Sequence, residues 1–374
     1  MTSSGVSRSR SLDILRLVAV LLVLGRHLEP FPIVFGKNLT FYVTRLWQNG
    51  GWTGVDLFFV LSGYLIGGLL FAEVNRTGGL RASRFLLRRG LKIYPAFYVF
   101  LATMLAAYAV RHVPMRSLSI VAECLFLQNY LGGLWNHTWS LAVEEHFYFS
   151  LPAVLLLLLR LRREGNDPFR VMPLLVASVA AVCLTLRIAL ARTLPFDNLV
   201  HLFPTHLRID SLLIGVGVAY AVHFHRDALL AWRKRWLPFL LLGPLAFLPA
   251  FCYPLGSRWW LHSIALTAFA AGAAAIMIAL FEVEPPPFPI VRFAAYLGSH
   301  SYSVYLWHTV IGILALGIRS RLPPTAAAWY LYAIVYVISA FAAGLLMAAA
   351  IEFPLLRIRD RLAPRAASPL RMPQ

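Results

Sequence analysis

Charged residues are scarce in this sequence. Asp, Glu, Lys and Arg make up only 13% of its 374 residues, whereas a soluble domain has about 25%. Hydrophobic residues make up 59%. Because buried area grows only slowly with chain length, a soluble fold would leave much of this apolar surface in water. The composition therefore excludes the soluble globular, disordered and fibrous classes.

Cysteine is rare, and the common cofactor motifs are missing. Cys124, Cys183 and Cys252 lie in apolar stretches without the spacing of metal ligands, so we expect neither a disulfide framework nor a metal site. The sequence has no Gly-Lys-Ser/Thr phosphate loop and no dinucleotide glycine fingerprint. It also has no internal repeat and no Gly/Ser linker. We expect no tightly bound cofactor.

Acidic residues are outnumbered by basic ones, 16 against 34, which gives a net charge of +18. In a soluble protein such an excess would suggest a nucleic-acid partner. In a chain this apolar, basic loops that face an anionic membrane leaflet explain the excess better. We therefore expect a lipid bilayer as partner and no nucleic acid.

Long apolar runs, by contrast, are plentiful. A helix needs about 20 mostly apolar residues to cross a bilayer, and backbone groups in lipid must be paired within the segment. The sequence therefore predicts an all-α polytopic membrane protein, with a short interfacial or re-entrant piece at 117–131. Its ten predicted transmembrane helices cover residues 12–29, 53–74, 91–110, 141–159, 171–190, 208–225, 237–253, 260–281, 296–317 and 326–352.

The basic residues are shared unequally between the two sides of this arrangement. The side that carries both termini receives 23 of them and the other side 11, so the positive-inside rule places both termini in the cytoplasm. The first apolar run has no small-residue cleavage site and is predicted to be a mature helix rather than a signal peptide. We expect an integral-membrane domain over residues 1–362, a short basic cytoplasmic tail over 363–374 and no appended soluble domain.

Several polar residues fall within the outer halves of the predicted spans. Ionisable groups there cost about 2.5–3.5 kcal/mol each and usually mark a site or a pathway. Each also has a simpler explanation: Asp56 as a helix cap, Arg208 with Asp210 as an ion pair, and His27 as an interfacial anchor. Because five spans bring such residues to one depth, we predict a shared polar chamber. Its members are His27, Asp56, His137, Ser140, Glu144, Glu145, His146, Arg208, Asp210 and His308.

Basic residues also gather at the predicted inner side. Arg16 lies eleven residues before His27, so both project from nearly one face of the helix, about 16 Å apart. Arg16 either contributes to a site or pairs with Asp13 and extends to the headgroups. A second group precedes Pro95 and is either ordinary topology-determining charge or a phosphate clamp. It consists of Arg84, Arg88, Arg89 and Lys92.

Seven motifs occur in order along the chain. They are Arg16-x10-His27, Gly54–Tyr64 (GVDLFFVLSGY), Arg89-x-x-Lys92-Ile93-x-Pro95, Thr138–Glu145 (TWSLAVEE), Arg208-Ile209-Asp210, Ser301–His308 (SYSVYLWH) and Ile351-Glu352-x-Pro354. Together they resemble the membrane-bound acyltransferase-3 family, the bacterial O-acyltransferases of surface polysaccharides, lipids and some antibiotics. The resemblance covers Arg16 to Pro354. The chain departs from the family at Lys92, where Arg is frequent, and at His146, where Gln or Trp is more usual.

This resemblance implies an acyl-CoA donor, usually acetyl-CoA, and a hydroxyl acceptor on a glycan or glycolipid. It also implies a place in the bacterial inner membrane. The donor's phosphates would bind the inner basic residues, which are Arg16, Arg84, Arg88, Arg89 and Lys92. The acceptor side would be formed by Asp56, Trp139 and Arg208. Any second transfer step would require another protein, and the sequence sets no oligomeric state.

His27 is the candidate general base for the acceptor hydroxyl, because an unperturbed imidazole has a pKa of about 6.5. Glu144 or Glu145 would orient it, with Asp210 as the next choice. Ser140 or Trp139 would stabilise the oxyanion. His308 is the second candidate for the base or a substrate ligand. A covalent acyl-His or acyl-Ser140 intermediate stays open.

Two other classes compete with the acyltransferase. A secondary transporter of a lipid-linked sugar or another solute would also use intramembrane His, Asp and Glu residues. Such transporters often contain two halves with matching motifs, and none are visible here. A partner protein that recruits glycan enzymes without chemistry would not need the polar set.

Overall fold

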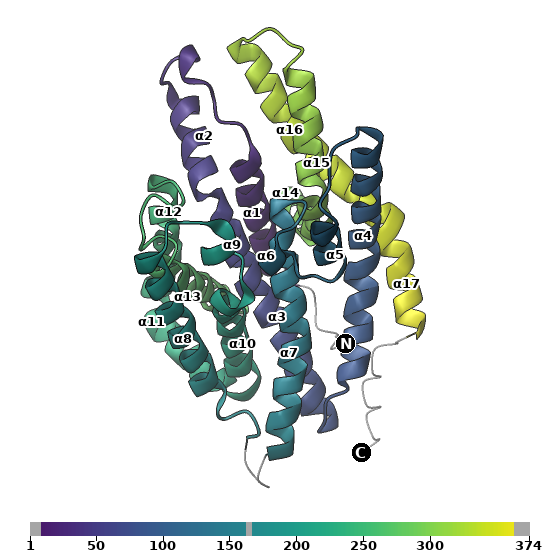
Figure 1. Cartoon of the computed structure of the whole chain (residues 1–374). Coiled ribbons are helices and arrows are strands. Elements are labelled where there is room, and N and C mark those ends of the chain that lie inside the picture. Colours follow the sequence, from purple (N-terminus) through teal and green to yellow (C-terminus); the bar gives the residue numbers. More distant parts are fainter. Residues whose placement is uncertain (1–8, 162–166, 363–374) are drawn as a thin grey trace.

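The computed structural model describes residues 9–161 and 167–362, and the predicted tail 363–374 lies outside them (Figure 1). This part of the chain is helical and contains no strand. Its helices are α1 Arg10–His27, α2 Leu39–Gly50, α3 Gly54–Thr77, α4 Ala82–Val110, α5 Ser117–Cys124, α6 Gln128–Leu131, α7 Trp139–Leu161, α8 Met172–Thr193, α9 Asn198–His201, α10 Ile209–Phe224, α11 Arg226–Leu240, α12 Leu248–Cys252, α13 Ile264–Ala279, α14 Pro289–Ser299, α15 Ser301–Arg319, α16 Ala326–Met347 and α17 Phe353–Leu362.

The all-helical, multi-pass membrane class is confirmed, but the number of ten spans is not. Six described helices are long and apolar enough to cross a membrane, or seven if one bent pair counts as a span. Helices α10 and α13 have 16 residues each, which is about 24 Å and less than a bilayer core of about 30 Å. The side on which the termini lie stays a prediction.

Three segments differ from the predicted boundaries. The predicted span 237–253 is broken, because segments Arg226–Pro238 and Gly243–Cys252 meet at 70°. Pro244 follows the break, and proline lacks the N–H that would continue a helix. The predicted span 296–317 is divided at His300 between α14 and α15. Helix α2 lies between the predicted spans 12–29 and 53–74, where no helix was predicted.

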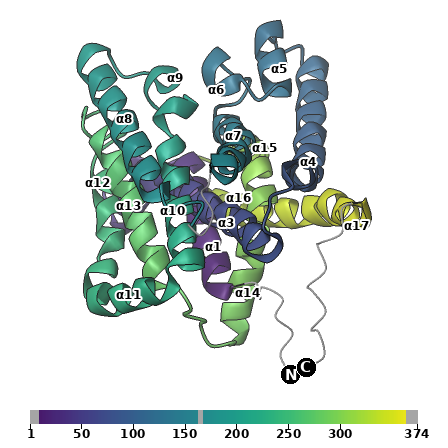
Figure 2. The ribbon, with the colours of Figure 1, turned by 90° about the horizontal axis from the view of Figure 1, so that it is seen from below.

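Helices α1 and α3 lie near the centre of the bundle when it is viewed along its length (Figure 2). Helix α3 crosses α10 at very close range. A Cβ atom on Gly63 would lie 1.8 Å from the Leu212 carbonyl oxygen, and one on Gly215 would lie 2.1 Å from that of Val60. Small residues of this kind let two helix backbones touch in a membrane. The close crossing holds α10 beside the motif Gly54–Tyr64.

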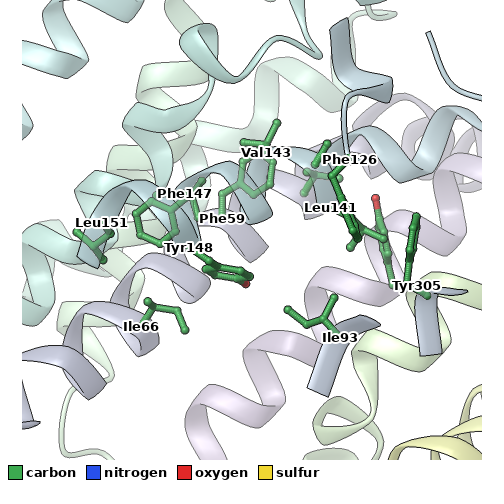
Figure 3. Close-up of a cluster of buried hydrophobic side chains, with 14 of the residues drawn as sticks. Phe59, Ile66, Ile93, Phe126, Leu141, Val143, Phe147, Tyr148, Leu151 and Tyr305 are labelled. Carbon is green, nitrogen blue, oxygen red and sulfur yellow. The ribbon is translucent and has the colours of Figure 1, made fainter. Parts of the chain in front are cut away.

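The largest apolar core surrounds α7 (Figure 3). Phe59 from α3 and Phe147 from α7 are 1% and 0% exposed, and Ile93 brings α4 to the same cluster. Tyr148 and Tyr305 also belong to this core, and both carry hydroxyl groups that need partners inside it. This apolar core therefore borders directly on buried polar groups. We call the end of the bundle with His27 the outer end and the end with Arg16 the inner end.

Candidate functional site

Three histidines from separate elements meet at the outer end of the bundle. His27 ends α1, His308 belongs to α15, and His137 lies in the 3-10 turn Asn136–Thr138 before α7. The ring of His308 lies 4.9 Å from that of His27 and 5.4 Å from that of His137, between centroids. His308 and His137 are buried at 0% and 5% exposure, whereas His27 is exposed. We call these three residues the histidine cluster.

Backbone contacts fix the orientation of the two buried rings. Nδ1 of His308 lies at hydrogen-bond distance from the Tyr305 carbonyl oxygen. A carbonyl only accepts, so this nitrogen carries the proton and Nε2 is left with a lone pair. That Nε2 is buried and has no hydrogen-bond partner among the described residues. His137 holds the Leu306 carbonyl in the same way through Nε2, at 3.3 Å.

Ser140 and Tyr305 lie on the inner side of the histidine cluster. Their hydroxyl groups lie 2.5 Å apart, and the Tyr305 hydroxyl donates to the His137 carbonyl oxygen at 2.6 Å. The Ser140 hydroxyl also lies 3.3 Å from that carbonyl. The proton of each hydroxyl is therefore already committed within this network.

One face of α7 leads from this network toward the inner end. Ser140, Glu144 and Tyr148 are spaced by four residues and so line one face of the helix. The Tyr148 hydroxyl donates to Glu144 Oε2 at 3.0 Å and lies 2.9 Å from the Ser62 hydroxyl on α3. The guanidinium of Arg89 lies 4.8 Å above the Tyr148 ring. A continuous polar face thus connects the histidine cluster with the inner basic residues.

The predicted carboxylate partners of His27 have other contacts. Glu144 accepts from Tyr148, and Glu145 accepts from the Tyr94 hydroxyl on α4 at 2.9 Å. Asp210 forms a two-point ion pair with Arg187 of α8, with nitrogen–oxygen distances of 2.6 and 3.2 Å. No carboxylate in residues 9–161 or 167–362 hydrogen-bonds to His27. Its ring neighbour is an imidazole instead.

Two buried ion pairs flank the chamber, and neither is the Arg208–Asp210 pair considered from the sequence. Arg208 Nη2 donates to Asp56 Oδ1 at 2.7 Å, and both side chains are at most 1% exposed. Asp56 is therefore an ion-pair partner and not a helix cap. The Arg208 guanidinium lies 5.5 Å from the ring of Trp139, which stacks on Phe203 at 4.9 Å. The structure thus brings together Asp56, Trp139 and Arg208.

The inner basic residues come from several helices. The charged groups that act on Lys92 include Arg16 from α1, Arg89 from α4 and Arg359 from α17, with Glu352 as the acidic member. Arg16 also pairs with Asp13, as one interpretation of the sequence expected. We call Arg16, Arg89, Lys92 and Arg359 the basic cluster.

Two predicted members stand outside this basic cluster. Arg88 pairs with Asp360 of α17 at 3.1 Å. Arg84 lies on the first turn of α4 and forms no ion pair with any described residue. The predicted inner group is thus divided between the cluster and the surface of α4.

Sequence reasoning missed three residues that the structure brings to the site. Tyr148 continues the spacing of Ser140 and Glu144, and that spacing was visible in the sequence. Ser62 lies within a recognised motif but was not given a role. Arg187 was counted only among the basic residues of the outer side, yet it is 1% exposed and holds Asp210, and no signal in the sequence showed this. No group of three His, Cys, Asp or Glu side chains suited to a metal ion occurs in the described part of the chain.

Comparisons with known proteins agree with these features. A family model described as an acyltransferase domain matches residues 9–349. The peptidoglycan O-acetyltransferase OatA of Listeria monocytogenes is 27% identical over 326 residues, which are 80% of this chain and 48% of that protein. The O-acetyltransferase OatA of Staphylococcus aureus is 25% identical over 308 residues, which are 72% and 47% of the two chains. The chain spans about half the length of these curated relatives. No solved structure matches it.

Proposed function

The chain belongs to the acyltransferase family whose model it matches, and on that premise we propose that it is an O-acetyltransferase. It takes an acetyl group from cytosolic acetyl-CoA and transfers it to a hydroxyl of a glycan or glycolipid acceptor. The acceptor lies at the outer face of the bacterial inner membrane. Both OatA relatives are named as O-acetyltransferases, which favours this function over the transporter considered from the sequence.

The observation that carries the proposal is the exposure of one imidazole against two buried ones. His27 is the exposed member of the histidine cluster, and it is the member that a substrate can reach. In the proposed reaction His27 removes the proton of the acceptor hydroxyl while the hydroxyl oxygen attacks the thioester carbonyl carbon. The carbon–sulfur bond then breaks, and the CoA thiolate leaves and takes up the proton. The products are an ester and CoA.

His308 replaces a carboxylate in this proposal. Its unpartnered Nε2 accepts a hydrogen bond, either from the His27 ring or from the acceptor hydroxyl. The oxyanion needs a donor, and the Ser140 proton is already bound within the Tyr305 network. We therefore assign the oxyanion to the indole N–H of Trp139.

The donor would enter from the inner end. Coenzyme A carries several phosphate charges, and arginine binds phosphate oxygens through two parallel hydrogen bonds. The basic cluster, with Arg84 and Arg88 at its edge, supplies those cations. The thioester arm would follow the face of α7 that carries Tyr148, Glu144 and Ser140. Arg16 lies eleven positions before His27 on α1, which is about 16 Å along the helix axis.

The decisive test is His27→Ala in the full chain. General-base catalysis typically contributes about 10²–10⁴-fold, so transfer of labelled acetyl from acetyl-CoA to an envelope extract should fall by that order. His112→Asn is the matched control, because His112 is an exposed histidine with φ of 52°, which asparagine tolerates. Full transfer by correctly inserted His27→Ala protein would contradict the mechanism. Solute uptake without release of CoA would favour the transporter.

A further inference from the structure

The five residues after His27 run between α2 and α16 at the outer end of α1. Figure 1 shows α2 and α16 on either side of that end. Two hollows open along this segment. The first, with a cavity volume of about 350 Å³, is lined only by apolar side chains and one threonine. Its lining includes Leu28, Val43, Trp47, Trp329, Ile334 and Ile338. We call it the chain groove.

A second hollow lies along the residues that follow Leu28. It has a cavity volume of about 470 Å³ and is lined by residues that directly follow Leu28, together with Phe41 and Arg45 of α2. Arg45 is exposed, lies 5.5 Å from the Phe41 ring and has no acidic partner among the described residues. The acidic residue of this hollow, Glu29, is already paired with Arg319 at 2.7 Å. We call this second hollow the head hollow, and Arg45 is the cation in it that has no acidic partner among the described residues.

Hydrogen bonds from both flanking helices hold the floor of these hollows. From α16, the Trp329 indole donates to the Glu29 carbonyl oxygen at 3.1 Å, and the Tyr332 hydroxyl accepts from the Glu29 amide at 3.2 Å. From α2, the Thr44 hydroxyl accepts from the Phe31 amide at 3.1 Å. These hydrogen bonds tie the segment that lines both hollows to α2 on one side and to α16 on the other.

We propose that the chain groove and the head hollow together bind one anionic membrane lipid, and that this lipid carries the acceptor hydroxyl. An apolar hollow between two helices in a membrane accommodates a hydrocarbon chain, and the unpaired Arg45 complements a phosphate at its end. Leu28 of the chain groove and Glu29 of the head hollow directly follow His27 in the chain, so both hollows begin within two residues of the exposed imidazole. This inference rests on the proposed function and names its acceptor class.

Binding is tested with a photoreactive lipid. The full-length protein is placed in phosphatidylcholine nanodiscs that contain a phosphatidylglycerol with a diazirine on one acyl chain, and labelled peptides are identified after irradiation. We expect the label on peptides that contain Val43 or Ile334. Ile334→Trp fills the groove and should reduce the label several-fold. Leu346→Trp is the control, because Leu346 is similarly exposed on the same helix, 62% against 57%, but does not line the groove.

The contribution of the Arg45 charge to lipid binding is tested separately. Arg45→Gln should lower phosphatidylglycerol labelling to the level given by a phosphatidylcholine with the same diazirine chain. Arg111→Gln, which removes an exposed cation at the end of α4, should change nothing. Equal labelling by the two lipids in the wild-type protein would overturn the site. Labelling spread evenly onto the exposed face of α8, where Leu174 is 70% exposed, would overturn it too.

The acceptor claim is tested by following the acetyl group. The purified protein receives labelled acetyl-CoA together with either the total lipid extract or the water-soluble saccharides of the same cells. We expect the label in the lipid fraction, lost in His27→Ala and reduced several-fold in Ile334→Trp. Label that enters only the saccharides would overturn the lipid acceptor and leave the acetyltransferase intact. Lipid photolabelling should persist in His27→Ala, so failures of the site and of the chemistry are distinguishable.

Discussion

At the scale of single residues, a buried nitrogen without a hydrogen-bond partner is costly, and His308 has one at Nε2. Its Nδ1 is held by the Tyr305 carbonyl, so the lone pair is fixed in direction. A protein that needed only a packed core would leave an apolar side chain there. We therefore interpret His308 as a positioning residue for the proton chemistry of His27.

Two substitutions distinguish the roles of the two ring nitrogens of His308. His308→Gln keeps an acceptor near the place of Nε2, and His308→Asn keeps a donor near the place of Nδ1. We expect kcat to fall by about tenfold or more in the asparagine variant and less in the glutamine variant, because only the former loses the proton acceptor. The measurement is kcat as a function of pH for both variants. Equal losses with unchanged pH profiles would assign His308 a purely structural role.

Glu123 gives a prediction about pH. It lies on α5 between two spans and is fully buried. Its Oε1 accepts from the Leu134 amide and from the Thr138 hydroxyl, both at 2.9 Å. Burial raises the pKa of Glu123 to about 7, although these hydrogen bonds oppose the shift.

Because the folded-state pKa of Glu123 is the higher one, protonation stabilises the fold. This contribution is complete below the unfolded pKa of about 4.3 and is lost as the pH rises through about 7. A shift of this size corresponds to roughly 3–4 kcal/mol. Glu123→Gln stays neutral, so its thermal unfolding temperature should vary less between pH 5 and pH 8. Identical pH dependence in the two proteins would contradict the assignment.

The sequence predicts which polar residues lie inside the bundle better than it predicts their partners. Arg208 was considered as a partner of Asp210 because the two are only two positions apart in the sequence. It pairs instead with Asp56, 152 positions away. Arg187 falls in the predicted span 171–190 and was counted only as an outer-side cation, yet it is buried against Asp210. Such pairs depend on how helices rotate about their axes, and a hydrophobic pattern that is apolar on all sides does not define that rotation.

At the scale of elements, each of the ten predicted apolar runs overlaps a described helix. The errors lie in breaks and in short helices. Helix α2 has only 12 residues and is too short for a transmembrane pattern. The break after Leu240 and the division at His300 depend on packing and on local proline geometry. Continuous hydrophobicity hides both features.

The crossing of α3 and α10 depends on glycine. Gly63→Val would force a side chain into the space occupied by the Leu212 carbonyl, so α10 must move away with Arg208 and Asp210. We expect lower thermal stability in detergent and loss of transfer. Gly68→Ala on the same helix is the control, because its nearest contact to an added Cβ is 3.4 Å. Equal stability of the two variants would show that the crossing adapts.

The Arg187–Asp210 pair links α8 to α10, and both side chains are fully buried. Asp210→Leu leaves an uncompensated buried cation, which typically costs about 3–5 kcal/mol. Arg187→Met in addition should recover most of this loss, because an apolar pair of similar volume is often tolerated. Unfolding temperatures of the single and double variants give the measurement. No recovery in the double variant would mean that the pair has a role beyond charge balance.

At the scale of the whole molecule, the two ends of the bundle have different tasks in the proposed reaction. The basic cluster would hold the donor, whereas the outer chamber and the hollows beside α2 would hold the acceptor. The composition predicted this sidedness through its uneven basic residues. Composition did not predict the polar connection between the two ends. That connection is formed by one face of α7 together with side chains from α3, α4 and α15.

The division of tasks predicts a kinetic difference. Arg88→Ala/Arg89→Ala should raise the KM for acetyl-CoA more than the KM for the acceptor. Each lost hydrogen bond to a charged group is worth about 1.5–3 kcal/mol, or roughly tenfold or more. Arg170→Ala, at an exposed cation between α7 and α8, is the control. An unchanged donor KM in the double variant would remove the donor role from this end.

The anchoring of the segment after His27 has a consequence for biosynthesis. The Glu29 amide donates a hydrogen bond to the hydroxyl of a tyrosine 303 positions later, so the ribosome makes His27 long before it makes the helix that holds the adjacent chain. At 5–20 residues per second this interval is about 15–60 s. During that time α1 resides in the membrane without its neighbours α15 and α16. If the segment after His27 must be anchored for the proposed reaction, the nascent protein would become active only after α16 has inserted.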